Sequence, residues 1–384
     1  MKYEKIRFGD LYAIGSRNGL SKPSKVRGLG YKMINMGELF ANDRIYDIPM
    51  ELVPLKEKEK INAKVEAGDL LFARQSLVLE GAGKCSIVME VSPLTVFESH
   101  LIRVRLLEEA NPSFYYYYFR SALSPIKSIV SQCAQAGIRG SDLQELCVLY
   151  PPKKTQDRIA NILEQYDNLI ENNQKQIKLL EEAAQRLYKE WFVNLHFPGY
   201  EDVEIVAGVP EGWTEGTLED VAPFKRGKTI TKVQVHDGDV PVVAGGLEPA
   251  YYHNVSNTVA PVITVSGSGA NAGYARLYNV NVFASDCSFV DSNSTPYLFY
   301  VYCFIKDNKD RFNALKKGSA QPHVYAKDIN ALEALIPTNK LIEEFCSIAS
   351  QYFEKIKILQ MQIQLSTQAR DRLLPKLMSG EIEV

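Results

Sequence analysis

The sequence lacks several features that would assign it to a familiar class at once. It has no apolar run of membrane-spanning length, and its six cysteines include no CxxC pair. It also lacks the phosphate-binding motif GxxxxGK[ST], and its five histidines are scattered without the spacing of metal ligands. No apolar signal segment follows Met1–Lys5. We therefore expect a cytoplasmic protein without a metal site, whose cysteines are small core residues in a reducing compartment.

The sequence also lacks a large net charge of either sign. The chain has 384 residues, a net charge of −2, 46% hydrophobic and 23% charged residues, which is ordinary for soluble globular protein of two or more domains. Such a balance argues against an indiscriminate polyanion binder. A nucleic-acid reader whose basic residues are local stays open.

One long stretch contains neither glycine nor proline between Pro152 and Pro198. Its apolar residues recur at steps of three and four, which is typical of a coiled-coil helix. These residues are Ile159, Ile162, Tyr166, Leu169 or Ile170, Ile177, Leu180, Ala184, Leu187 and Trp191. Asn173 interrupts the apolar stripe, as a register-setting polar residue often does. At the helical rise the part from Thr155 to Trp191 would span roughly 55 Å, so a second helix must cover the stripe.

The second helix appears when the sequence is aligned with itself at an offset of 186 residues. Pro151 then matches Pro337, and Tyr166 matches Tyr352. The apolar stripe returns at Phe345, Ile348, Tyr352, Ile356, Leu359, Ile363, Leu373 and Leu377. We expect the two helices to pair antiparallel, with Pro375–Val384 packing back near the first domain.

The segments that precede the two helices also repeat. Leu71–Ser76 matches Pro261–Ser266, and both are expected to be buried strands leading into polar loops. The predicted fold is therefore α+β: a tandem duplication of a strand-rich globular domain plus a long helix, the helices forming an antiparallel coiled coil. The predicted parts are residues 1–150, a first helix at 151–197, a linker and second domain at 198–336, and a second helix at 337–384.

This order of domains and helices, with four short motifs, resembles the specificity (S) subunit of type I restriction–modification systems. The motifs are Tyr150–Gln156 and Ile336–Lys340 at the helix starts, Pro210–Trp213 at the start of the second domain, and Gly318–His323 near its end. The second helix start departs from the first in having Ile342 where Gln156 stands. The resemblance implies two target recognition domains that read a bipartite site in double-stranded DNA.

The resemblance also implies partners and their cofactors. The paired helices would act as a spacer and dock two methyltransferase (M) subunits, which bind S-adenosylmethionine and methylate adenine. Restriction/translocase (R) subunits would add cleavage that depends on ATP and magnesium. This chain would direct both activities and catalyse neither. The spacer residues expected to serve in pairing or partner binding are Ile159, Ile162, Tyr166, Ile177, Leu187, Phe345, Ile348, Tyr352, Ile363 and Leu373.

Three stretches look like sites but have simpler interpretations. Gly267–Ala272 fits the dinucleotide pattern GxGxxA, yet a strand-like segment follows, so a hairpin tip is expected. Asn111–Phe114 resembles part of an amino-methyltransferase motif but lacks its second proline, and a helix-initiating turn is expected. The aromatic run Phe114–Phe119 would point all round a helix, so most of it should be core.

The candidate DNA contacts are polar residues in loops at strand ends, because Arg, Lys, Asn and Gln match base edges while Ser and Gly approach phosphates. In the first domain they are Arg74, Gln75, Ser76, Lys84, Gln135, Arg139 and Ser141. In the second they are Lys225, Arg226, Lys228, Ser266, Ser268, Asn271, Lys317, Ser319, Gln321 and His323. The alternative is a structural adaptor, with two protein- or ligand-binding domains on a coiled coil.

Overall fold

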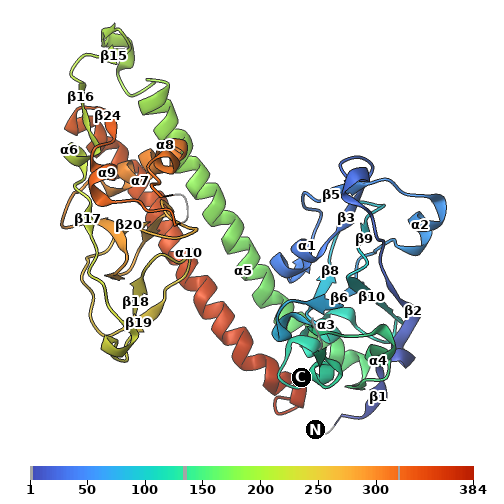
Figure 1. Ribbon diagram of the computed structural model, residues 1–384. Helices are drawn as coiled ribbons and strands as arrows, with labels where there is room; N and C mark the ends of the chain where they lie inside the picture. The colour runs from blue at the N-terminus through green and yellow to red at the C-terminus, as the bar shows by residue number, and fades with distance from the viewer. Residues whose placement is uncertain (1–2, 133–135, 319–320) are drawn as a thin grey trace. The chain divides into compact units, whose positions relative to one another are not determined.

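The chain folds into two compact units, each with its own core (Figure 1). The computed structural model describes residues 3–132, 136–318 and 321–384. The first unit comprises Met1–Glu171 and Ile363–Val384, and the second comprises Asn172–Gln362. Each unit therefore combines a strand-rich half with a segment of both long helices. Over the described ranges, no helix has the length and apolar character needed to cross a membrane.

The two long helices are α5 (Lys153–Tyr188) and α10 (Asn339–Ser379). Helix α5 begins directly after Pro151–Pro152, because the residue before a proline disfavours the helical conformation. It ends in a π-helical turn, Lys189–Val193. Helix α10 continues through Pro375 and ends at Ser379. Leu377 and Met378 near its end are buried in the core of the first unit, as expected for the C-terminal segment.

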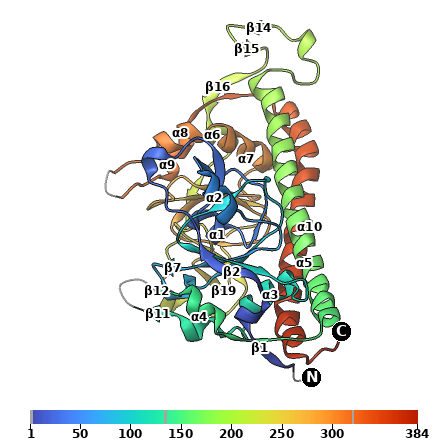
Figure 2. The ribbon, with the colours of Figure 1, turned by 90° about the vertical axis from the view of Figure 1, so that its right-hand side faces the viewer.

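The helices pair antiparallel, as predicted (Figure 2). In the second unit, Asn173 donates a hydrogen bond to Gln362 (Nδ2 to Oε1, 3.2 Å), while farther along α5 the ring of Tyr188 lies 6.1 Å from that of Phe345. Residue numbers thus rise along α5 as they fall along α10. In the first unit, Arg370 of α10 donates to the buried carboxylate of Asp167 on α5 (Nη1 to Oδ1, 2.5 Å).

Four positions of the predicted stripe of α5 are buried, namely Ile159, Ile170, Ala184 and Trp191. Near the start of the helix, Leu163 and Asp167 are buried as well, and the predicted Ile162 and Tyr166 lie at the half-buried flank beside them. The reason is that α5 packs against its own globular half as well as against α10. Tyr117 of the first unit, for example, donates to Asp167 (Oη to Oδ2, 2.7 Å). A helix with two packing partners buries a wider face than a coiled-coil seam.

The first unit is built on a central sheet whose strands all contribute to the core. Its order is β2 (Tyr12–Asn18), β10 (Leu101–Leu106), β6 (Leu70–Ala73), β8 (Cys85–Val88) and β4 (Arg44–Ile45). A second sheet has the order β5 (Glu51–Val53), β3 (Tyr31–Ile34) and β9 (Val96–Phe97). A two-stranded ladder joins β1 (Lys5–Arg7) to β13 (Cys147–Leu149), just before α5.

The second unit repeats this topology. Its central sheet has the order β17 (Lys225–Arg226), β23 (Cys287–Asp291), β20 (Val262–Ser266) and β21 (Ala275–Tyr278). The second sheet is β19 (Tyr251–His253), β18 (Val240–Val243) and β22 (Phe283–Ala284). The terminal ladder is β16 (Thr214–Thr217) with β24 (Glu333–Ile336), just before α10. Strand for strand, these match β2-β10-β6-β8, β5-β3-β9 and β1-β13, which confirms the duplication.

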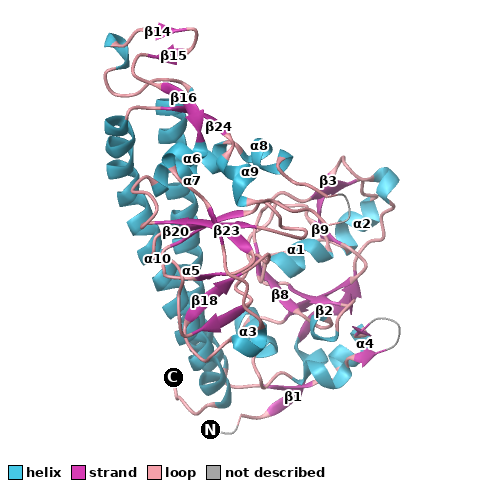
Figure 3. Cartoon of the chain, turned by 60° about the vertical axis from the view of Figure 1, so that its left-hand side comes forward, coloured by secondary structure: helices cyan, strands magenta, loops and turns pink. Residues whose placement is uncertain are grey.

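One helix covers the equivalent face in each unit (Figure 3). In the first, α3 (Pro112–Arg120) packs on β8, and all of its residues from Phe114 to Phe119 are buried, as predicted. Asn111 caps it by accepting a hydrogen bond from the backbone N–H of Phe114 (3.0 Å), which confirms the helix-initiating turn. The helix ends at Arg120, and the segment from Pro125 forms a separate 3-10 turn. In the second unit, α7 (Leu298–Asp307) packs on β20 and β21.

The cysteines follow the prediction with one exception. Cys85, Cys287 and Cys303 are buried, and burial raises the pKa of the Cys287 thiol to about 12. Cys147 is exposed on β13, because successive residues of a strand point to opposite faces. Cys133 lies outside the described residues. The described part of the chain holds no group of three or more His, Cys, Asp or Glu side chains placed to bind a metal ion.

Candidate nucleic-acid interface

Three short segments from distant parts of the sequence meet at one edge of the first unit. Strand β7 (Gln75–Ser76) follows β6 directly and pairs antiparallel with β12 (Ala136–Gly137). Strand β12 in turn pairs with β11 (Ser131–Gln132). The predicted contact residues Arg74–Ser76 are thereby placed beside the loop that leads to Arg139. We call this the first recognition edge.

The second unit has the same arrangement in a reduced form. Ser268, just beyond the end of β20, bridges His323, and His323 bridges Lys317. The backbone N–H of Lys317 donates to the carbonyl of His323 (2.9 Å), and the N–H of His323 donates back to Lys317 (2.8 Å). We call these three segments the second recognition edge. Equivalent segments of the two repeats are therefore brought together in both units.

Within the first recognition edge, some side chains are fixed and others are free to reach a ligand. Arg74 is half-buried and donates to the carbonyl of Ser99 (3.3 Å), while Ser76 accepts from the N–H of Val78 (3.2 Å). Ser141 donates to Asp142 (3.1 Å) in the first turn of α4 (Gly140–Gln144). Arg139 precedes α4 and is exposed. Gln135 lies outside the described residues.

Gln75 has a partner that the sequence did not reveal. The Nδ1 atom of His100 lies 2.9 Å from the Gln75 side-chain oxygen, so a protonated Nδ1 would donate to it and leave the amide group directed by this contact. His100 is exposed and comes just before β10. No spacing or motif joins residues 75 and 100, and only the pairing of β10 with β6 brings them together.

The ammonium group of Lys84 is already bound by other groups of the protein. Its ammonium group donates to the carbonyl of Phe40 (2.9 Å) and forms a salt bridge with Asp43 (3.2 Å). Asp43 also binds Arg120 (2.6 Å). Two cations share this carboxylate, which makes Lys84 part of an internal charge cluster.

The second recognition edge presents an imidazole and a lysine. His323 is half-buried, and its ring stacks on that of Tyr325 at 6.0 Å between centroids. Lys317 is exposed and its ammonium group donates to Asp328 (2.7 Å). Gln321 is exposed, and Ser319 lies outside the described residues.

A glycine-rich hairpin supports this edge, which confirms the expected hairpin tip between β20 and β21. Gly269 and Gly273 adopt φ values of +77° and +81°, a region that side chains with a Cβ rarely enter. Ser266 is buried and donates to the carbonyl of Gly245 (3.1 Å), so its hydroxyl holds the loop. Ser268 donates to Asp286 (2.5 Å) and Asn271 to the Gly245 carbonyl (3.4 Å). Asp286 and Gly245 were missed from the sequence, which gives no local sign of these contacts.

A basic strand lies at the other edge of the same sheet. Lys225 and Arg226 form β17, and with Lys228 they are exposed. Arg226 is opposite Ser288 on β23, which is opposite Val265 near the end of β20. No salt bridge joins any of these three cations to a carboxylate in the described ranges. Their positive charge is therefore free to face an anionic ligand.

The family model of the type I restriction modification DNA specificity domain matches the chain twice, over residues 1–182 and 210–366. This chain belongs to that family. A specificity subunit of the type I restriction enzyme MjaIX from Methanocaldococcus jannaschii is 26% identical, covering 71% of this chain and 69% of the relative.

Two further similarities span almost the whole length of this specificity-family chain. A putative specificity subunit of the type I restriction enzyme MjaX from the same archaeon is 23% identical and covers 96% of this chain and 91% of the relative. The crystal structure of the type I system S subunit from M. genitalium has a TM-score of 0.63 at 17% identity, covering 98% and 96% of the two chains. The latter likeness shows a shared fold.

The predicted spacer residues lie in the helix pair of this family member but differ in exposure. Ile159 and Phe345 are buried. The half-buried ones are Ile162, Tyr166, Ile177, Leu187, Ile348, Tyr352, Ile363 and Leu373. A second group of apolar side chains on the same helices is exposed: Leu169, Leu179, Ile358, Met361 and Leu365.

Proposed function

We propose that this chain is the DNA-specificity subunit of a type I restriction–modification complex, and that each unit reads one part of a split site in double-stranded DNA. The observation that carries the proposal is the repetition of the recognition edge. The same three segments meet in both units, in a chain that the specificity-domain model matches twice. Two different sets of side chains on one scaffold suit two different half-sites.

The chemistry of the two edges suits base readout beside phosphate contact. Gln75 and Arg139 in the first unit, and Gln321 in the second, carry the paired or multiple hydrogen-bonding groups that distinguish base edges in the major groove. Lys225, Arg226 and Lys228 carry no sequence information of their own and suit phosphates. On this proposal, base choice depends on the recognition edges, and general affinity depends on the cations around them.

The partners are proposed on the same basis. Exposed apolar side chains on α5 and α10, such as Leu179 and Met361, are suited to contact methyltransferase (M) subunits. S-adenosylmethionine would be bound by those subunits, and ATP and magnesium by restriction/translocase (R) subunits. This chain would supply specificity to both reactions without carrying out either.

Reconstitution tests the proposal. Mixed with a methyltransferase subunit from its own genome, the chain should confer adenine methylation at a split sequence, and alone with S-adenosylmethionine it should methylate nothing. A matched heptad inserted in α5 and α10 should change the spacing of the two halves and leave both halves unaltered. The proposal would be wrong if the isolated chain methylated DNA, or if the recognised DNA sequence were continuous and not split.

The adaptor alternative predicts a different response to salt. Its support is the near-neutral net charge of −2. If DNA is the ligand, affinity must fall steeply as salt rises, because bound phosphates release counterions. Association with a protein ligand that is insensitive to salt, together with no binding to duplex DNA, would favour the adaptor.

A further inference from the structure

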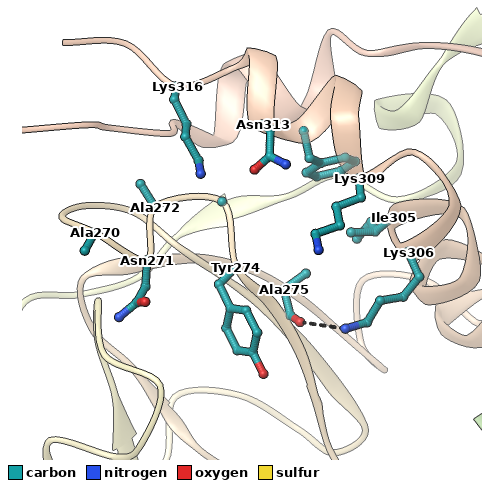
Figure 4. A pocket seen from close by; sticks show the side chains of 12 residues that line it. Ala270, Asn271, Ala272, Tyr274, Ala275, Ile305, Lys306, Lys309, Asn313 and Lys316 are labelled. Carbon is teal, nitrogen blue, oxygen red and sulfur yellow. Dashed lines mark hydrogen bonds between the residues drawn. The ribbon is translucent and has the colours of Figure 1, made fainter. Parts of the chain in front are cut away.

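A pocket of about 320 Å³ lies beside the second recognition edge, between the glycine-rich hairpin and the helices that follow α7 (Figure 4). Its hairpin side is formed by Asn271 and the segment to Ala275. Its helical side is formed by the end of α7 and by α8 (Lys309–Ala314). Lys306, Lys309 and Lys316 line it, and we call it the lysine pocket. Figure 4 shows the amino groups of Lys309 and Lys316 directed toward the hairpin.

The charge of the lysine pocket is not balanced from within. No carboxylate in the described ranges forms a salt bridge with any of its three lysines. Lys306 donates to the carbonyl of Ala275 (3.4 Å), and its ammonium group lies 5.1 Å from the ring centre of Tyr302. Desolvation by burial is the main reason that the pKa of Lys306 is lowered; the charge of Glu181 opposes it, and Lys309 lowers the pKa by a smaller amount. A bound anion would place a negative charge beside these ammonium groups.

The first unit contains a pocket at the same place in the fold, and the contrast is informative. That pocket, of about 730 Å³, lies between the β6–β8 loop and the end of α3. Arg120 lines it, at the repeat position of Lys306. Here, however, Asp43 forms salt bridges with both Arg120 (2.6 Å) and Lys84 (3.2 Å). Asp43 precedes β4, a strand without a counterpart in the sheet of the second unit. The cation at this repeat position is paired with a carboxylate in the first pocket, and within the described chain it is not in the second.

The lysine pocket is also continuous with the second recognition edge. Lys316 is followed directly by Lys317, whose backbone pairs with His323. Asn271 belongs to the hairpin that holds Ser268, the other neighbour of His323. A duplex whose bases face His323 would therefore bring its sugar–phosphate backbone near the lysines.

We propose that the lysine pocket binds a backbone phosphate of the DNA read by the second recognition edge. Lys309 and Lys316 would supply the ammonium groups, and Asn313 an additional amide donor. The contact would be independent of sequence, and it would fix the position of the second unit on the duplex. This inference rests on the proposed DNA-specificity function.

The test uses the full chain and a labelled duplex containing its site, with affinity measured across a series of salt concentrations. Replacing both lysines (Lys309→Gln with Lys316→Gln) should weaken binding to all duplexes alike. The slope of log affinity against log salt should become shallower by about 0.9 for one lost phosphate contact. The matched control is Lys340→Gln with Lys357→Gln, which removes two charges from α10 in the same unit and should leave the slope unchanged.

A second measurement locates the phosphate. Neutral methylphosphonate linkages placed one at a time along the duplex should weaken binding of the natural chain at one position flanking the second half-site. At that position the double variant should show no further loss. Arginine at both positions should restore the slope, which separates loss of charge from a folding defect.

The phosphate site and the proposed DNA-specificity function can fail separately. If the natural chain shows no salt-dependent binding to DNA, the proposed function fails and the phosphate site with it. The phosphate site alone is overturned if the natural chain binds DNA but the double variant keeps the full salt slope. It is also overturned if there is no methylphosphonate position at which the double variant shows no further loss of affinity. A change of base preference in the double variant would also overturn it, since a phosphate contact reads no sequence.

Discussion

The two units place cations at the same point of the same fold and treat them differently. In the first, Asp43 binds Arg120 and Lys84, and the three side chains form part of the domain structure. In the second, Lys306 and its neighbours have no carboxylate within salt-bridge distance in the described chain. A duplicated domain can therefore keep its topology while one additional acidic residue, Asp43, pairs with cations that could otherwise bind a ligand.

The starts of the two long helices differ in a similar way. Gln156 is buried in the first unit, where it accepts from the backbone N–H of Asn111 (2.9 Å) and donates to the carbonyl of Pro151 (2.8 Å). At the same repeat position in the second unit, Ile342 is fully buried in the apolar core. One unit fixes its helix with a side chain that satisfies two backbone groups, and the other fixes it with apolar packing.

The largest effect is expected from a deletion that distinguishes the cores. Removing residues 363–384 takes Leu377 and Met378 out of the first core and Arg370 away from the buried Asp167. Each buried apolar side chain contributes about 2–5 kcal/mol, so the first unit should lose cooperative folding. Hydrogen exchange should show loss of protection in the first unit and native protection in the second. Equal loss in both would show that the cores are not independent, and removal of residues 383–384 alone is the control.

Exchanging the residues at the two helix starts should have the next largest effect. Ile342→Gln buries an amide without the two partners that Gln156 has, at a cost of about 2–4 kcal/mol. Gln156→Ile leaves the N–H of Asn111 and the carbonyl of Pro151 without their bonds, at about 1–3 kcal/mol. Urea denaturation of each single variant measures both costs. If each unit tolerated the residue of the other, the two starts would be equivalent and the contrast would be false.

Asp43→Asn should have a smaller effect that depends on pH. Burial by itself would raise the pKa of Asp43, but hydrogen bonds and charge from Arg120 and Lys84 outweigh it and hold the pKa below its usual value. The ionised carboxylate therefore stabilises the fold at neutral pH, and this stabilisation is lost as the pH falls through the folded-state pKa. The variant should be less stable by at most about 1 kcal/mol at pH 7, because solvent screens the ion pairs of this partly exposed carboxylate, and the difference should shrink in acid.

Thermal unfolding of both proteins from pH 7 to pH 3 measures this difference. A gap that stays constant across the range would mean that Asp43 acts through packing and not through charge. The same variant sharpens the comparison between the pockets, because it leaves two cations of the first pocket without their shared carboxylate. With Arg120 and Lys84 released from Asp43, its affinity for DNA should then depend more steeply on salt than that of the natural chain.

Much of the fold could be predicted because its signals are long or repeated. The apolar period identified α5 and α10, and the repeat at 186 residues identified the duplication. Within α5 the prediction chose Ile162 and Tyr166 where the adjacent Leu163 and Asp167 are buried, since periodicity cannot show that a helix packs against two partners at once. The buried aromatic helix α3 was predicted because consecutive tyrosines occupy every face of a helix.

The candidate interface could be predicted only at the level of loops. The repeat indicated which segments would meet, but side-chain pairs across remote segments leave no local pattern. His100 with Gln75, and Ser268 with Asp286, are contacts of this kind. Ser266 was selected by its place in the repeat, whereas its burial depends on Gly245, which lies on a different loop. Which of the candidate residues contact DNA stays a prediction.

The division of the chain between the units bears on how the protein folds as it leaves the ribosome. The second unit is one continuous segment, Asn172–Gln362, whereas the first needs Ile363–Val384 to complete its core. Domains generally fold as units during synthesis, the N-terminal one first. In this chain we expect the reverse order, because the first core is incomplete until the last turns of α10 have been made. Until then the apolar surface around Leu163 should stay uncovered, and nascent chains should depend on chaperones most during that interval.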